Sequence, residues 1–246
     1  MIIDEIKYFA KKYVEAINRN AKPMKYTPME IIFYMSSPIA LNHAWLNFDG
    51  LIGHLLLLKY LGKDYYLLPR KFNLFRVINK NDLPESPIKL SHGDLYHSSI
   101  SFFDTDSLKM EVLYKKFEDR WIKGHRKISK GSGHFRDYMM RHIYIPTRTV
   151  SFYVNADRKA MEYLCSLIVG LGDNCRVGYG AVSGFEIKST DKDYSLIKDG
   201  KAMRPIPRRY LKKCKRVVNV AWKPPYWSPE NVDICCIPKE EIEIEL

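Results

Sequence analysis

The glycine-rich stretch VGLGDNCRVGYG at residues 169–180 constrains the fold most, because of what stands on either side of it. Apolar residues at helical spacing predict a helix over 157–169, and AVSGFEI predicts a strand over 181–187. A dinucleotide-binding or P-loop fold needs the opposite order, with glycines after a strand and before a helix. The stretch therefore argues against a loop that binds a mononucleotide or dinucleotide phosphate.

The predicted elements before this stretch extend the pattern. We expect a strand over 31–36, a helix over 48–61, irregular strands such as DYYLLP and LYHSSISFF, and a strand over 149–154. Asn47 or Asp49 could cap the first of these helices, and Asn155 or Asp157 the second. With the helix and strand around the glycines, the order is that of a ferredoxin-like βαββαβ fold with a large insertion. The predicted fold class is therefore α+β.

Three regions divide the chain. Residues 1–28 contain an amphipathic helix over 4–18, and residues 29–195 form the ferredoxin-like domain, with its insertion at about 65–146. Residues 196–246 are basic and rich in proline, so we expect an extended tail that packs over the domain.

The net charge of +12 is concentrated in two stretches. Residues 115–148 hold ten Lys and Arg against three acids, and residues 201–216 hold eight Lys and Arg and no acid. A charge that only kept the protein soluble would be spread evenly. The concentration favours a polyanionic partner, although a solvated loop and a charged tail are the structural alternatives.

The five cysteines show no CxxC spacing and are odd in number, so the sequence predicts neither a disulfide framework nor a zinc site. The adjacent Cys235 and Cys236 are expected to be inert. The N-terminal stretch does not read as a signal peptide, and HLLLLKYL, the longest apolar run, is too short to cross a bilayer. We expect a cytoplasmic protein with no membrane partner and no cofactor.

Two interpretations of the glycine-rich stretch remain. In the structural one, Gly170 and Gly172 end the helix and Gly178 and Gly180 let the next strand pass close to a neighbour. In the other, the glycines let an RNA backbone approach, Arg176 contacts phosphate and Tyr179 stacks on a base.

This part of the chain resembles the glycine-rich loop of the RAMP superfamily of CRISPR-associated proteins. After the helix it has Gly170-Leu171-Gly172, a five-residue spacer that contains Arg176, then Gly178-Tyr179-Gly180 and the strand. SSPIALNHAWLNFDGLIGHLL is similar to the first strand and helix of the Cas-five-like subunit of type IV CRISPR systems. MRPIPRR and KPPYW resemble that subunit's C-terminal part.

The resemblance implies an RRM-related RAMP fold whose insertion forms a thumb near RNA. It implies a subunit that grips the repeat-derived five-prime handle of the guide RNA, caps a filament of backbone RAMP subunits and lies beside the large effector subunit. Target DNA near the protospacer-adjacent motif is a further implied partner. The expected RNA-binding residues are Lys123, Arg126, Lys127, Lys130, Arg136, Arg141, Arg148, Gly170, Gly172, Arg176, Gly178, Tyr179, Gly180, Arg204, Arg208 and Arg209.

Catalysis is the main alternative, since some relatives cleave the guide precursor. Metal-independent RNA cleavage needs a base for the 2′-hydroxyl and an acid for the leaving oxygen. His54, His125, His134 and His142 are candidates, but no spacing singles one out, and type IV systems usually carry a separate nuclease. We therefore expect a non-catalytic RNA-binding subunit, with a metal-independent endoribonuclease as the second hypothesis and a general RNA-binding protein as the third.

Overall fold

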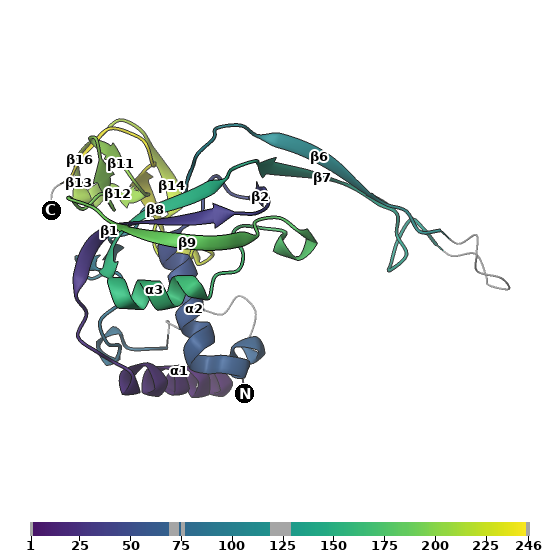
Figure 1. Ribbon diagram of the computed structural model, residues 1–246. Helices are drawn as coiled ribbons and strands as arrows, with labels where there is room; N and C mark the ends of the chain where they lie inside the picture. Colours follow the sequence, from purple (N-terminus) through teal and green to yellow (C-terminus); the bar gives the residue numbers. More distant parts are fainter. Residues whose placement is uncertain (1, 69–73, 75–76, 119–128, 245–246) are drawn as a thin grey trace.

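The computed structural model describes residues 2–68, 74, 77–118 and 129–244, and it confirms a mixed α+β protein with several antiparallel sheets and few helices. The central sheet has four strands in the order β5-β8-β1-β9, with every neighbouring pair antiparallel (Figure 1). Its strands are β1 (Tyr26–Met35), β5 (Phe102–Phe103), β8 (Thr149–Asp157) and β9 (Val182–Ser189).

The two predicted helices of this unit cover one face of the sheet (Figure 1). Helix α2 (Phe48–Leu61) follows β1, and α3 (Arg158–Ser166) follows β8. Asp157 caps α3, because its carboxylate accepts a hydrogen bond of 2.9 Å from the Ala160 N–H. Asn47 occupies the N-cap position of α2 without a side-chain hydrogen bond.

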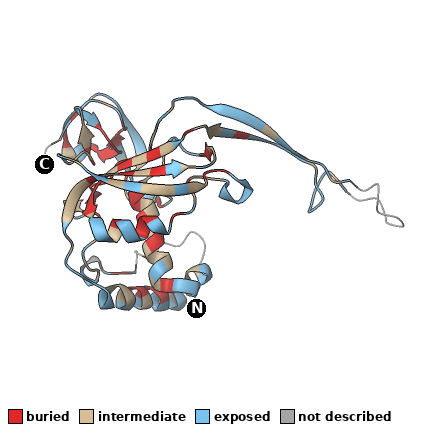
Figure 2. Ribbon diagram, viewed as in Figure 1, coloured by how far each residue is buried: buried red, intermediate tan, exposed pale blue. Residues whose placement is uncertain are grey.

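The core lies between this sheet and its helices. Ile31, Phe33, Phe48 and Phe152 are completely buried there, and Figure 2 shows the buried residues gathered in the body of the molecule. Burial of such side chains contributes about 1.5–3 kcal/mol each, so this cluster dominates the stability of the sheet.

The N-terminal helix α1 (Ile2–Arg19) packs against α2 in a separate apolar cluster. Ile6, Phe9, Ala10 and Tyr13 of its predicted apolar stripe are buried, whereas its charged residues face solvent. The segment DYYLLP was expected to be a strand, but its residues 64–67 belong to a 3-10 helix, η1 (Gly62–Leu67), and Leu68 follows that helix. Its last residue, Pro69, lies outside the described residues.

The expectation of an extended C-terminal tail is wrong, because the segment folds into short antiparallel strands around its own core. Trp222, Ile206, Leu211 and Cys235 belong to that core. The strands are β10 (Ile197–Lys198), β11 (Lys201–Ala202), β12 (Ile206–Pro207), β13 (Leu211–Cys214), β14 (Val217–Ala221), β15 (Val232–Cys236) and β16 (Ile242–Ile244), with 3-10 turns η5 (Arg208–Tyr210) and η6 (Pro229–Asn231).

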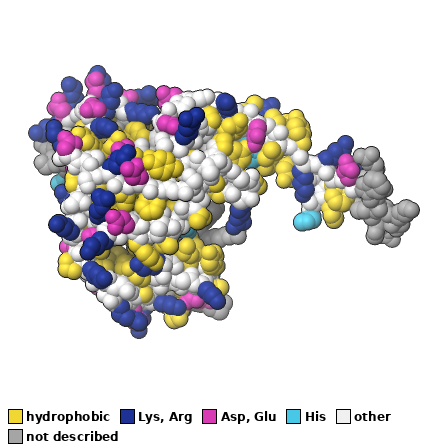
Figure 3. Space-filling view, viewed as in Figure 1, with side chains coloured by type: hydrophobic (Ala, Val, Ile, Leu, Met, Phe, Trp, Pro, Cys, Tyr) yellow, Lys and Arg dark blue, Asp and Glu magenta, His cyan; other side chains and the backbone are white. Residues whose placement is uncertain are grey.

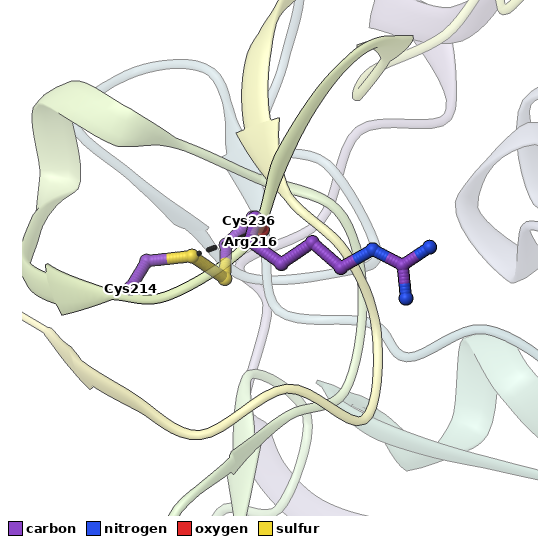
Figure 4. Close-up of a disulfide and its surroundings, with 3 residues drawn as sticks. All are labelled: Cys214, Arg216 and Cys236. Atoms are coloured by element: carbon purple, nitrogen blue, oxygen red, sulfur yellow. Dashed lines mark hydrogen bonds between the residues drawn. A yellow bond between two sulfur atoms is a disulfide. The ribbon is translucent and has the colours of Figure 1, made fainter.

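Cys236 was expected to be inert, and this too is corrected. Cys236 forms a disulfide with Cys214, and the two Cα atoms are 6.1 Å apart (Figure 4). The disulfide joins β13 to β15, which belong to different sheets of the C-terminal segment. Cys165, Cys175 and Cys235 are free thiols.

The insertion contains short elements and one long ribbon. The short elements are β3 (Leu90–Ser91), β4 (Leu95–Tyr96) and the 3-10 turn η3 (Lys80–Asp82). The ribbon is formed by β6 (Lys109–Lys115) and β7 (Tyr138–Ile145), and β7 also pairs with β2 (Ile39–Ala40). Within the described part of the chain, no helix is long and apolar enough to cross a membrane.

Candidate nucleic-acid interface

The β6–β7 ribbon extends far from the body of the molecule (Figure 1), and we call its described residues, 109–118 and 129–145, the arm. Lys115, Arg136 and Arg141 of the arm are exposed, and Lys130 is half-buried. The Lys115 ammonium lies 5.5 Å from the centre of the Tyr138 ring. Lys123, Arg126 and Lys127, which the sequence placed in the RNA site, lie outside the described residues, as does His125.

The two faces of the arm differ in chemistry. Residues paired across the ribbon share a face, so Met110, Tyr114, Met139 and Ile143 lie together on one face with Arg141. These four apolar side chains are 55–74% exposed. A two-stranded ribbon is marginally stable alone in water, and exposed apolar surface of this kind marks an interaction site.

The glycine-rich loop, residues 169–180, joins the base of the arm through β2. The Asp173 N–H donates to the Ala40 carbonyl at 2.8 Å, and the Gly180 N–H donates to the Pro38 carbonyl at 2.7 Å. Because β7 pairs with the same short strand, the loop and the arm are fixed to one another through the backbone of β2.

Gly172 and Gly180 of this loop pack against protein backbone. Gly172 has φ +85°, and a Cβ atom there would lie 2.6 Å from the Ala40 carbonyl oxygen. Gly180 has φ +66°, and a Cβ atom would lie 1.8 Å from the Leu171 carbonyl oxygen. The structural interpretation therefore holds at these two positions, where only glycine fits.

The tip of the glycine-rich loop is different. Gly178 has φ +102° with open space around it, and Arg176 is exposed. Asn174 precedes the 3-10 turn η4 (Cys175–Val177) in the left-handed conformation. Of the glycine-loop residues expected to contact RNA, Arg176 and Gly178 are thus the accessible ones, and Gly170 is half-buried, with a Cβ position 3.2 Å from the Cys175 sulfur.

Tyr179 does not offer its ring to a base in this structure, which corrects the sequence-based interpretation. The side chain is buried beneath the arm, where the ring stacks on His142 at 5.9 Å and also contacts Tyr144. Its hydroxyl donates a hydrogen bond to Glu111 of β6. Asn174 reinforces the contact, since its amide donates to His142 Nδ1 at 3.2 Å. Tyr179 therefore fixes the base of the arm.

Arg204 is likewise not an RNA contact, since it is only 1% exposed. Its guanidinium donates to Asp49 Oδ2 at 3.1 Å and to the Trp222 carbonyl at 2.5 Å. The Tyr226 hydroxyl donates to Asp49 at 2.7 Å. Burial would lower the Arg204 pKa, but the Asp49 carboxylate and the Tyr226 hydroxyl together outweigh that effect and raise it. One buried ion pair thus joins the stretches FDGLIG, MRPIPRR and KPPYW. Because Arg204 is buried in it, its positive charge does not contribute to the surface charge of the protein.

Arg208, Arg209 and Arg148 are exposed. Arg209 pairs with Asp233 and lies 4.8 Å from the centre of the Tyr210 ring, so its charge is partly neutralised. Lys215 of the same basic run pairs with Glu241 at 3.1 Å. The second basic stretch therefore carries less free charge than the sequence suggested, whereas the arm keeps its exposed cations.

A buried polar cluster escaped the sequence reasoning. His97 Nδ1 lies 2.8 Å from Asp193 Oδ2, and His97 Nε2 lies 2.6 Å from the Ser91 hydroxyl. Burial would raise the pKa of Asp193, but hydrogen bonds from His97, Ser195 and Asn155 outweigh that effect and hold it well below its usual range. Since these residues come from three distant segments, 91–97, 155 and 193–195, only contact prediction could have found the cluster. Among the described residues, no group of His, Cys, Asp and Glu is arranged to hold a metal ion.

The fold and the arm together define a class: a mixed α+β protein with a projecting, basic and partly apolar arm. The comparisons give the family. Residues 97–238, more than half of the chain, match the family described as CRISPR type IV associated protein Csf3. The chain belongs to this family of type IV CRISPR-associated proteins, which confirms the resemblance seen in the sequence.

Other comparisons are more distant. A chain in the cryo-EM structure of the type III-B Cmr-beta complex bound to cognate target RNA is similar at 14% identity, with a TM-score of 0.38. The match covers 73% of the present chain and 66% of the other. No curated protein matches the sequence.

Proposed function

We propose that the protein is a non-catalytic guide-RNA-binding subunit of a type IV CRISPR effector complex. It grips the repeat-derived five-prime handle and caps the filament of backbone subunits. The observation that carries the proposal is the arm, a ribbon with exposed cations that the glycine-rich loop holds at its base. Family membership supports the CRISPR setting.

The central sheet supports a ferredoxin-like, RRM-related RAMP fold for this subunit. In chain order the unit runs β1, α2, β5, β8, α3 and β9, and its sheet order places the first and third strands in the middle. A split βαβ arrangement of this kind needs two helices on one face. The arm then corresponds to the insertion between the second and third core strands.

RNA binding is assigned to the arm and to the accessible tip of the glycine-rich loop. Lys115, Arg136 and Arg141 supply charge for phosphates, and Arg176 lies in the loop that is fixed to the arm. Lys123, Arg126 and Lys127 are proposed to extend the same site on sequence grounds. Phosphate contacts position the strand without reading its bases, so recognition of the handle needs further contacts.

Partner subunits are assigned to exposed apolar surface. The apolar side chains Met110, Tyr114, Met139 and Ile143, which surround Arg141 on one face of the arm, suit contact with another protein, so this face combines one phosphate contact with a protein contact. The backbone subunits, the large subunit and target DNA near the protospacer-adjacent motif are the partners that this role implies.

The experiment that tests this function uses purified protein, labelled repeat RNA and EDTA. We expect the RNA to be bound and recovered uncut, with tighter binding to the handle than to a scrambled RNA of equal length. Equal binding to both RNAs would contradict a handle-binding subunit and favour a general RNA-binding protein.

Endoribonuclease activity is the alternative, and one observation favours it. His142 Nε2 is buried with no hydrogen-bond partner in the described structure, and the Tyr179 ring stacks beside it. Cleavage of the labelled RNA in EDTA that disappears in His142→Ala or His134→Ala, but not in His43→Ala, would establish this activity and contradict the non-catalytic proposal.

A further inference from the structure

A large groove lies on the helical side of the molecule, away from the arm. It has a volume of about 1130 Å³ and is bordered by the end of α1, the following residues 20–25, α2 and the start of α3. Its apolar lining includes Ile17, Leu56 and Leu164. Figure 3 shows hydrophobic side chains with Lys and Arg around them over this part of the molecule.

We propose that this groove docks an acidic, amphipathic segment of a partner protein. Lys22, Lys25, Lys59 and Lys159 lie along it, against the two carboxylates of Glu85 and Asp157. Arg158 also lines the groove, but it pairs with Glu162 at 3.0 Å. A segment that presents Asp and Glu beside Leu, Ile or Val would match both the charged rim and the apolar lining.

The two carboxylates of the groove already accept hydrogen bonds from backbone N–H groups. Asp157 accepts from the N–H groups of Ala160 and Lys25, at 2.9 and 3.0 Å, and Glu85 accepts from that of Met24 at 3.2 Å. They therefore hold the local backbone in place, while Lys22, Lys25 and Lys159 have exposed side chains. An incoming acidic segment meets cations at the rim.

The aromatic rings favour a protein segment over RNA bases. The Lys59 ammonium lies 4.2 Å from the centre of the Tyr163 ring and 5.2 Å from that of Tyr60. The edge of Tyr60 also packs against Tyr13, with ring centres 6.1 Å apart. Stacking platforms for single-stranded RNA need open ring faces. Here the Lys59 ammonium lies over one face of the half-exposed Tyr163 ring, and the rest of the lining mixes aliphatic side chains and prolines with charged ones.

The size of the groove suits several side chains. Small-molecule pockets have volumes of about 300–1,000 Å³, and this groove is slightly larger. An amphipathic helix or extended segment that presents successive apolar anchors can fill such a volume with several side chains, whereas a small metabolite would leave part of it empty.

The test replaces Tyr163, which is 48% exposed, with a photo-reactive phenylalanine. The protein is co-expressed with its neighbouring genes and purified as the effector complex, a choice that rests on the proposed function. We expect a covalent product with another protein subunit, through a segment rich in Asp and Glu with interspersed apolar residues. The same probe at Tyr8, 59% exposed on α1, is the positional control and should give no such product.

Charge reversal separates docking from chance proximity. Lys22→Glu with Lys159→Glu should lower the yield of the product roughly fivefold, whereas Lys7→Glu with Lys192→Glu, an equal change of charge, should leave it unchanged. A product with RNA or with a second copy of the chain, or equal yields from both double variants, overturns the proposal.

Failure of this inference is distinguishable from failure of the proposed function. A complex that retains RNA and its other subunits, but gives no protein product at position 163, overturns the docking proposal alone. A preparation with neither RNA nor other subunits contradicts the proposed function and, since nothing then occupies the groove, the docking proposal as well.

Discussion

At the residue scale, the same residue type serves different roles at nearby positions. Gly172 and Gly178 belong to one loop, and both have positive φ, yet a side chain at the first would strike the Ala40 carbonyl and at the second would meet open space. Arg204 and Arg208 belong to one basic run, yet the first is buried and ion-paired and the second is exposed. Each pair provides a variant and its matched control.

We expect Gly172→Ala to destabilise the protein more than Gly178→Ala. Both changes strain a left-handed backbone, at about 1 kcal/mol, and only the first adds a clash with β2, for a total on the order of 3 kcal/mol. Urea unfolding of both variants measures the difference. Equal losses would show that Gly172 does not pack against β2 as described.

Removing the buried charge of Arg204 should be costly. In Arg204→Met, Asp49 remains buried without its cation, and we expect a loss of about 3–5 kcal/mol in the free energy of unfolding. Arg208→Met, at an exposed position, should change stability by less than about 0.5 kcal/mol. Urea unfolding compares the two variants, and similar losses would contradict the assignment of Arg204 to the core.

The buried cluster around Asp193 predicts an acid dependence. Because the folded-state pKa of Asp193 is lowered, its contribution to stability is complete above the unfolded pKa of about 3.9 and is lost as pH falls towards the folded pKa. Asp193→Asn should therefore be less stable than the parent at pH 6, with the difference shrinking below about pH 4. Unfolding at several pH values tests this, and a constant difference would contradict a lowered folded-state pKa for Asp193.

At the element scale, the sequence predicted elements whose burial is one-sided. Helices α2 and α3 and strands β8 and β9 were expected within a few residues of their bounds, because their apolar residues alternate with polar ones at clear periods. The two strands of the arm were not predicted, because both faces of the ribbon are exposed and only β6 alternates apolar with polar residues. The C-terminal strands were missed because all of them are only two to five residues long and prolines lie between several of them.

The candidate site was partly predictable for similar reasons. The basic stretch 115–148 identified the arm, since exposed charge can be read from composition. The burial of Arg204 and of Tyr179 could not be read, because their partners Asp49 and His142 are distant in the chain. The Cys214–Cys236 pairing also depends on contacts between strands, which cysteine spacing does not reveal.

The disulfide should stabilise the C-terminal strands. It closes a loop over a separation of 22 residues, for which the chain-entropy estimate is roughly 3 kcal/mol. Cys214→Ser should therefore lower the unfolding free energy by about that amount, and Cys175→Ser, at an exposed free thiol, should change it little. Thermal melts in the presence and absence of a reductant measure it. A parent protein insensitive to reductant would contradict a stabilising disulfide.

At the scale of the whole molecule, the arm stands apart from the body (Figure 1) and carries both exposed cations and exposed apolar side chains. The arm projects its cations away from the body, and the glycine-rich loop holds the base of the arm through β2 and Tyr179 (Figure 1). The C-terminal segment is fixed to α2 by the Arg204–Asp49 pair. The parts that carried the family resemblance therefore build the scaffold, and the arm is the part available to a polyanionic partner.

The central claim is that the arm binds the guide RNA through its phosphates. The most direct measurement is the affinity for repeat RNA at several salt concentrations for Lys115→Glu/Arg136→Glu/Arg141→Glu and for a matched control, Lys7→Glu/Lys63→Glu/Lys192→Glu. We predict that the arm variant binds more than roughly tenfold more weakly, with a salt slope smaller by about 2, and that the control behaves like the parent. Equal affinities and equal slopes for the two variants would contradict the account.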